Sequence, residues 1–244
     1  MNKLVKKSAW IISAVILTVA LFSFANTKPA ASKPLPAACK ISVNKSYLYD
    51  SLHLNNSGLS RQAFSYAMKG YNYLLSLGKI KNDETVSIID FSLPSYTKRL
   101  FVVDVKKGIV LFNTYVSHGR NSGKEVAGKF SNEPESFESS LGFYITSDTY
   151  NGKHGYSLRL EGEEAGINDN AFSRGIVMHS APYVNERLIQ KQGYIGRSEG
   201  CPAVPEKLYK SIIEKIKNGS CLFMYSPDKD YMTHSQIINN GALV

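Results

Sequence analysis

One cysteine stands in a setting that is typical of a reactive thiol. Cys201 lies in the loop-forming stretch GRSEGCP (196–202). A thiol is only a few per cent ionised at neutral pH, so it needs a neighbouring base or positive charge to become a strong nucleophile. Upstream, His179 ends the short apolar run 176–178, and histidine exchanges protons near neutral pH. The pair predicts covalent acyl transfer, with Cys201 as nucleophile and His179 as its base.

The glycine before the cysteine points to the same chemistry. Because Gly200 has no side chain, its backbone can approach a substrate closely. The N–H groups of Gly200 and Cys201 are therefore candidates for binding a developing oxyanion, each contributing on the order of 3 kcal/mol. The alternative for Cys201 is a buried structural thiol, and its loop setting between Gly200 and Pro202 argues against that.

Chain order and histidine spacing argue against two other kinds of site. His179 precedes Cys201, which is opposite to the order in papain-like and related cell-wall cysteine peptidases. The five histidines contain no pair at helical or zinc-finger spacing, and Cys201 has no nearby cysteine partner. We therefore predict that the reaction uses no metal and no cofactor.

These residues resemble the signature of L,D-transpeptidases of the YkuD-like family, in which a histidine and a spacer precede Ser/Thr-His-Gly-Cys. The matching residues are His179-Ser180 and the stretch SEGC (198–201). Further segments resemble one branch, the murein L,D-transpeptidase catalytic domain family, and they lie at 116–123, 139–142, 152–155 and 168–171. The likeness covers residues 91–225 and implies a mainly β, sandwich-like catalytic fold with a few helices, α+β overall.

The resemblance also implies a substrate and a reaction. The cysteine would attack the carbonyl on the L-side of a diamino acid in a peptidoglycan tetrapeptide stem, expel the terminal D-alanine and form a thioester. An amine of a neighbouring stem would then accept the acyl group, and carbapenems would acylate the same cysteine. A water acceptor would instead make the chain an L,D-carboxypeptidase or endopeptidase. A third alternative, a non-catalytic wall-binding module, conflicts with the intact Cys201 and His179.

The chain departs from the general signature at two places. Glu199 stands where a second histidine is usual, and Pro202-Ala203 stands where an Arg or Asn normally follows the cysteine by two. A glutamate facing the thiolate would raise the thiol pKa, so we expect Glu199 to point to solvent. Ser180 resembles the residue whose backbone orients the histidine, and an ordinary loop serine is the alternative.

Five residues near the motifs are candidates for contact with substrate. Arg197 and Arg174 would also supply the missing positive charge near the thiol, with surface salt bridges as the alternative. The histidines in Gly-rich segments would contact substrate or support the catalytic residues, with a hydrogen-bonded loop histidine as the alternative. The candidates are Ser198, Arg197, Arg174, His118 and His154.

The elements that must position this site are mostly strands. Apolar runs and alternating patterns predict strands over 85–91, 99–105, 109–116, 142–146, 156–160, 175–179 and 221–225. Helical spacing predicts a helix over 60–78, with Ser60 as its N-cap, and another over 205–217, with Pro205 in its first turn.

The N-terminal segment predicts export. A basic stretch (1–7) precedes an uncharged apolar run (8–25), which is the pattern of a secretory signal. We predict a signal peptide (1–25) cut after Ala25, or retained as a membrane anchor, and a location in the periplasm or cell wall. The remaining predicted parts are a Pro/Ala/Ser/Lys-rich tether (26–59), a packed helix (60–83), the catalytic domain (84–227) and a tail (228–244).

Net charge bears on the binding partners of the protein, and the cysteine count bears on its disulfides. The net charge of +9 suits an anionic polymer, yet the sequence has no run of five basic residues and no nucleic-acid motif. We therefore expect no nucleic acid as a partner, while the family resemblance implies peptidoglycan stem peptides. Three cysteines are an odd set for an exported chain, so Cys39 and Cys221 either form a disulfide or leave Cys221 as a buried core residue.

Overall fold

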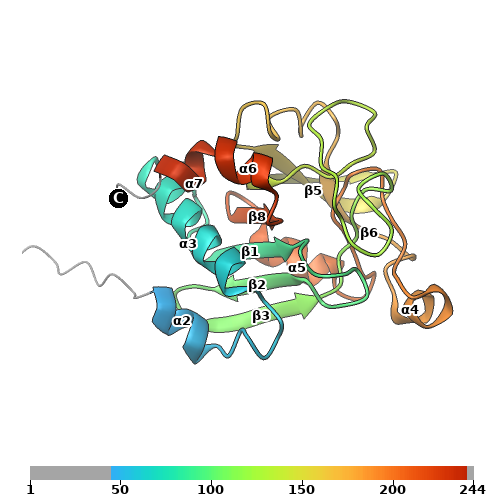
Figure 1. Cartoon of the computed structure of the whole chain (residues 1–244), viewed down its shortest axis with the longest axis horizontal. Helices are drawn as coiled ribbons and strands as arrows, with labels where there is room; N and C mark the ends of the chain where they lie inside the picture. The colour runs from blue at the N-terminus through green and yellow to red at the C-terminus, as the bar shows by residue number, and fades with distance from the viewer. Residues whose placement is uncertain (1–44, 241–244) are drawn as a thin grey trace, which may run out of the picture. The chain divides into compact units, whose positions relative to one another are not determined.

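The computed structural model describes residues 45–240, which are built around one eight-stranded mixed sheet (Figure 1). The strand order is β3-β2-β1-β8-β4-β5-β6-β7. The predicted mainly β fold with a few helices is confirmed. The strands are β1 (Thr85–Asp90), β2 (Leu100–Asp104), β3 (Ile109–Thr114), β4 (Gly142–Gly152), β5 (Gly155–Gly162), β6 (Val177–Ser180), β7 (Ala203–Val204) and β8 (Cys221–Tyr225).

The centre of the sheet is made by strands that are buried on both faces. Every residue of β1, β2 and β8 is buried. Strand β8 runs parallel to β1 and antiparallel to β4, so the last strand in sequence is central in the sheet. Strands covered on both faces favour apolar residues, and β8 (CLFMY) and most of β2 (LFVVD) have them. Cys221 lies in β8 as a buried free thiol, whereas Cys39 lies outside the described residues.

Helix α3 (Arg61–Ser76) covers the sheet beside β1 and β8. The Ser60 side chain caps it as predicted, accepting a hydrogen bond from Ala63 N at 3.3 Å. A glycine at the contact lets the helix approach the sheet, because a Cβ on Gly70 would stand 2.1 Å from the Phe143 ring. The apolar stripe of α3 that the 60–78 pattern predicts is therefore core.

The far end of the sheet brings together two segments distant in sequence. Strand β6 pairs antiparallel with β5 and parallel with β7. In the latter pair His179 lies opposite Ala203, two residues after Cys201. Strands β4 and β5 are longer than predicted and form a hairpin that reaches Gly152 and Gly155. The β6–β7 pairing places the cysteine loop next to the strand that carries the histidine.

The remaining helices differ more from the predictions. Helix α5 begins at Tyr209 because 205–208 first form a turn, in which Leu208 N donates to Pro205 O. Helix α2 lies in the range predicted as tether, where Leu48 and Tyr49 are buried. The helices are α2 (Lys45–Ser51), α4 (Glu186–Gln192), α5 (Tyr209–Ile216), α6 (Lys229–His234) and α7 (Gln236–Asn240).

The C-terminal helices are packed rather than peripheral. Helix α7 lies beside α3 (Figure 1), and Tyr231, Ile237 and Ile238 are buried. The predicted signal peptide lies outside the described residues. Within 45–240, none of the helices has the length and apolar character needed to cross a bilayer.

A buried carboxylate, Glu164, ties these helices to the sheet. It accepts hydrogen bonds from Phe143 N at 2.8 Å and Tyr231 Oη at 3.1 Å, and also from the Ser235 hydroxyl. Glu164→Ala would leave three buried donors without this acceptor, so we expect a loss of about 3 kcal/mol in the free energy of unfolding. Urea denaturation measures it, with the exposed Glu161→Ala as control. Equal losses for the two variants would contradict this role.

Candidate active site

The cysteine loop runs directly beside the strand that carries His179. Val177 N lies 3.5 Å from Cys201 Sγ and can donate to it. Val177 and His179 are two residues apart in β6, so their side chains leave the same face of the strand. The structure thus places the loop of Cys201, the predicted nucleophile, beside the strand that carries His179, the predicted base.

The sulfur is partly exposed and lies in a setting that favours the protonated thiol. Its hydrogen points to Gly175 O, with a sulfur-to-oxygen distance of 3.6 Å. Burial raises the pKa of Cys201 above its ordinary value; the Val177 N–H and the positive charge of Arg174 oppose this, and Glu199 adds to it. Cys201 therefore rests as a protonated thiol, which would need a base to act as a nucleophile.

The hydrogen bond of His179 leaves one ring nitrogen able to accept a proton. Its Nδ1 lies 2.8 Å from Ser180 O, and a carbonyl oxygen only accepts, so Nδ1 carries the hydrogen and the neutral ring keeps its lone pair on Nε2. The side chain is 2% exposed, and burial lowers its pKa below the ordinary histidine value. A neutral imidazole next to a neutral thiol is the form suited to general-base catalysis.

The loop around the cysteine requires glycine at position 200. Gly200 has a φ of +120°, and a Cβ there would lie 2.8 Å from Glu138 O. Its N–H donates to Ser198 Oγ at 3.2 Å, so this predicted oxyanion donor is already paired. The Cys201 N–H has no hydrogen-bond acceptor within the described part of the chain, and it is the better candidate.

Ser198 shapes the loop from inside. Its hydroxyl donates to Cys201 O at 2.6 Å, and its N–H donates to His118 O at 2.9 Å. The side chain is buried, which removes it from direct contact with a stem peptide. The neighbouring strand segment adds a second tie, because Ser117 N donates to Ala203 O at 2.8 Å. These bonds fix the backbone on both sides of Cys201.

Arg174 holds a neighbouring loop (131–140) against the cysteine. Its Nη1 donates to Ser131 O at 2.8 Å and to Ser140 Oγ at 2.6 Å, while its Nη2 donates to Glu138 O at 2.7 Å. The half-buried guanidinium also favours the Cys201 thiolate electrostatically. Arg174 therefore supplies positive charge from a fixed position rather than from a surface salt bridge.

His118 is fully buried and cannot contact substrate. Its Nδ1 accepts from Arg99 Nη2 at 2.7 Å, and its Nε2 donates to Gly123 O at 3.3 Å. Burial and the adjacent Arg99 lower the pKa of His118 to about 3, so the ring stays neutral. Arg99 is itself buried and also donates to Val116 O, which fixes the segment that supports Ser198.

The two charged residues next to Ser198 face outward. Arg197 Nη1 donates to Arg120 O and to Gly123 O, each at 3.1 Å. Glu199 forms an exposed ion pair with Arg120 at 3.5 Å, and its side chain is 68% exposed, as predicted. These contacts hold the side chains of Arg197 and Glu199 on other groups than the Cys201 sulfur.

Replacing Glu199 should therefore change catalysis little. Because the carboxylate is exposed and screened by water, we expect Glu199→Gln to alter kcat/KM by less than about threefold. Steady-state assays at neutral pH measure this, with Arg120→Gln as the matched change on the other side of the ion pair. A loss or gain of tenfold in Glu199→Gln alone would contradict the exposed placement.

Sequence reasoning missed two residues that the fold brings to the site. Tyr183 lies against the cysteine loop, because a Cβ added at Gly196 would stand 2.5 Å from Tyr183 Cβ. Burial and the charge of Cys201 raise the pKa of Tyr183 to about 12, while a hydrogen bond with Ser117 opposes the rise. Its position four residues after His179 was the available signal. Arg99 is the second, and the signal was its place inside the predicted strand 99–105, where a buried charge needs hydrogen-bond partners.

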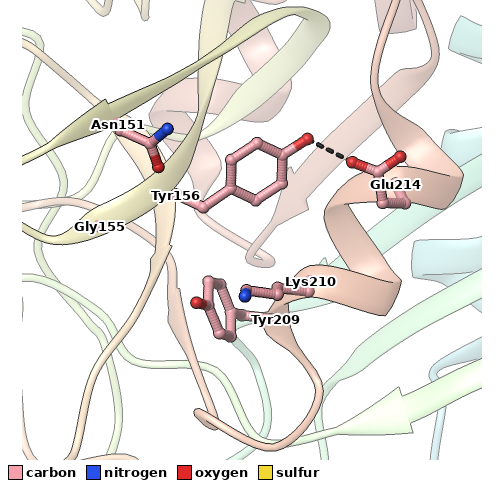
Figure 2. A pocket seen from close by; sticks show the side chains of 6 residues that line it. All are labelled: Asn151, Gly155, Tyr156, Tyr209, Lys210 and Glu214. Carbon is pink, nitrogen blue, oxygen red and sulfur yellow. Dashed lines mark hydrogen bonds between the residues drawn. The ribbon is translucent and has the colours of Figure 1, made fainter.

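The hairpin of β4 and β5 completes the surroundings. His154 lies in the turn of this hairpin, and its ring stacks on the ring of His179. A pocket of about 500 Å³ lies between this hairpin and α5 (Figure 2), lined by Asn151, Gly155, Tyr156, Tyr209, Lys210 and Glu214.

Within residues 45–240, no group of three His, Cys, Asp or Glu side chains is placed to hold a metal. The described residues thus offer a thiol, an imidazole and a backbone donor for acyl transfer.

Comparison with known proteins identifies one family. The model of the L,D-transpeptidase catalytic domain matches residues 55–225. A search of curated proteins found no match.

Similar solved structures include three of low sequence identity. An L,D-transpeptidase from Mycobacterium smegmatis is 16% identical, with a TM-score of 0.37 and coverage of 59% of each chain. The helical cell shape determining protein Pgp2 from Campylobacter jejuni is 11% identical, with a TM-score of 0.42 and coverage of 76% of this chain and 62% of that one. L,D-transpeptidase 3 from Mycobacterium tuberculosis, in complex with a faropenem-derived adduct, is 13% identical, with a TM-score of 0.36 and coverage of 59% and 60%. The chain thus spans about three fifths of the length of these proteins.

Proposed function

The chain belongs to the L,D-transpeptidase catalytic domain family, and we propose that it cross-links peptidoglycan through a thioester on Cys201. The observation that carries the proposal is the placement of a partly exposed thiol beside β6, whose His179 has Nδ1 bound to Ser180 O and Nε2 left as proton acceptor. This is the arrangement that a cysteine acyl transfer requires.

The first half-reaction forms the thioester. The Cys201 sulfur attacks the carbonyl carbon on the L-side of the diamino acid in a tetrapeptide stem, as His179 Nε2 takes the thiol proton. The carbonyl oxygen becomes an oxyanion, for which the Cys201 N–H is the proposed donor. When the carbonyl re-forms, the bond to the terminal D-alanine breaks, and the imidazolium returns its proton to the leaving amine.

The second half-reaction consumes the thioester. An amine of a neighbouring stem attacks the thioester carbonyl, His179 accepts a proton from that amine, and the sulfur leaves and is reprotonated by the imidazolium. The products are a new amide cross-link and the original thiol. The same thiol is expected to open the β-lactam ring of a carbapenem and form a stable acyl-enzyme.

The substrate sets the proposed location. Peptidoglycan lies in the cell envelope, and the basic and apolar segments of residues 1–25 match an export signal. We propose that the protein acts in the periplasm or cell wall. The net charge of +9 favours association with an anionic wall polymer.

The proposal is tested by intact-mass measurement of the purified protein mixed with a disaccharide tetrapeptide, with separation of the muropeptide products. We expect a thioester adduct, release of D-alanine and a cross-linked dimer. A tripeptide product without dimer would make water the acceptor and the protein an L,D-carboxypeptidase. Intact protein with neither adduct nor product, and no acylation by imipenem, would overturn the enzymatic assignment in favour of a wall-binding module.

A further inference from the structure

A second histidine lies on the catalytic one. The rings of His154 and His179 are stacked, with centroids 4.3 Å apart and planes inclined by 25°. His154 is exposed, whereas His179 is 2% exposed. The exposed ring therefore forms part of the cover that separates the buried imidazole from solvent.

The hairpin holds His154 in this place. Its tip is a two-residue turn between paired Gly152 and Gly155, and Gly155 has a φ of +74°. Next to the turn, the Tyr156 hydroxyl donates to the Glu214 carboxylate on α5 (Figure 2). Glu214 in turn pairs with Lys217 at 2.8 Å. The turn that carries the stacked His154 ring is thus anchored to α5, a helix that contains neither Cys201 nor His179.

The stack has an electrostatic consequence. Two imidazolium rings at this separation repel each other, so a positive His154 disfavours protonation of His179. Burial is the larger cause of the lowered pKa of His179, its bond to Ser180 O opposes the shift, and His154 adds the electrostatic part. The elements packed against β6 also carry other charged or titratable side chains, which are Tyr156, Arg159 and Glu161 on β5, Glu199 and Cys201 before β7, and Tyr209, Lys210, Glu214 and Lys215 on α5.

We propose that His154 is a positioning residue for the acyl transfer, which covers His179 and keeps its imidazole in the neutral, proton-accepting form. The inference rests on the proposed function, since it takes His179 as the base that receives the Cys201 proton. Nothing in this role requires His154 to touch the substrate. The ring acts through its contact with His179 alone.

The direction of the effect follows from the charge states. A general base works in its neutral form, so a lower His179 pKa extends activity to lower pH. Removing the charge of His154 should raise the His179 pKa, and removing the ring as well should raise it further, because water then reaches the imidazole. The acid limb of kcat/KM should move to higher pH by the same amount.

The test measures His179 directly. The imidazole C–H signals of the full-length protein are titrated by NMR in wild type, His154→Phe and His154→Ala, together with the pH profile of Cys201 acylation by imipenem. We expect the His179 pKa to rise by roughly half a unit in His154→Phe, which keeps a stacked ring, and by about one unit in His154→Ala. The acid limb of acylation should shift in step.

Two controls separate this role from loss of structure. His234→Ala removes an exposed histidine from α6 and should leave the His179 titration unchanged. Tyr156→Phe removes the hydrogen bond to Glu214 without changing the stacked ring, and should raise the His179 pKa less than His154→Ala does. Should His154→Ala not fold, His154→Phe decides.

The two proposals fail in different ways. An unchanged His179 pKa in His154→Phe and His154→Ala overturns the inference, whether or not the wild type is acylated. Absence of acylation in the wild type, with His179 still titrating differently in the two variants, overturns the proposed function and leaves the contact intact.

Discussion

Cys201→Ala should abolish acyl transfer, lowering kcat/KM by about 10⁴-fold or more. The thioester is bonded through Sγ, so the variant has no atom on which to build the intermediate. The loop around residue 201 should keep its shape, because the bonds from Ser198 and Ser117 go to backbone atoms. Intact mass after incubation with tetrapeptide or imipenem measures the loss as absence of an adduct.

Cys221→Ala is the matched control. Cys221 is the other free thiol of the described residues, fully buried in β8, and burial raises its pKa well above the ordinary value. It should therefore form no adduct, and Cys221→Ala should retain wild-type acylation while losing some stability through the small cavity. Adduct formation by Cys201→Ala, or its loss in Cys221→Ala, would move the nucleophile away from the predicted loop.

The parts of the fold that follow local rules were predictable. The strands over 99–105 and 221–225 were visible as mainly apolar runs, because strands buried on both faces favour apolar residues. The strand over 85–91 was visible from Val86, Ile88 and Ile89, although it also buries Thr85, Ser87 and Asp90. The helix of 60–78 was visible from its stripe and from Ser60, whose cap is a local hydrogen bond. Cys201 and His179 stood out as candidates because few residue types can act as a nucleophile or a base at neutral pH.

Contacts between distant segments were not predictable. Arg174 reads as one more basic residue, and its role as a clamp depends on carbonyls at 131 and 138 that only the folded chain brings near. The tail from 228 reads as polar and peripheral, yet its Tyr231 hydroxyl reaches Glu164 across 67 residues. His154 likewise stacks on a ring that lies 25 residues later in the sequence. The pairing of β5 with β6 brings the two histidines together, and the sequence does not show that pairing.

His179→Gln should lower kcat/KM at neutral pH by about 10²-fold to 10⁴-fold. Glutamine has a similar size, and its amide can still donate to Ser180 O, so the local backbone should be preserved. It cannot accept the proton from the Cys201 thiol. Acylation rates with imipenem measure the effect, and the same change at the exposed His234 serves as control, with an expected change below about twofold.

The pH profile distinguishes a lost base from a distorted loop. In wild type, acylation should level off above the His179 pKa, which burial holds below the ordinary value. In His179→Gln only the thiolate can react, so the rate should climb about tenfold per pH unit towards the raised Cys201 pKa and approach the wild-type rate in strongly alkaline solution. A distorted loop would instead lower the rate by the same factor at every pH. Such a parallel profile would contradict the assignment of His179 as the proton acceptor.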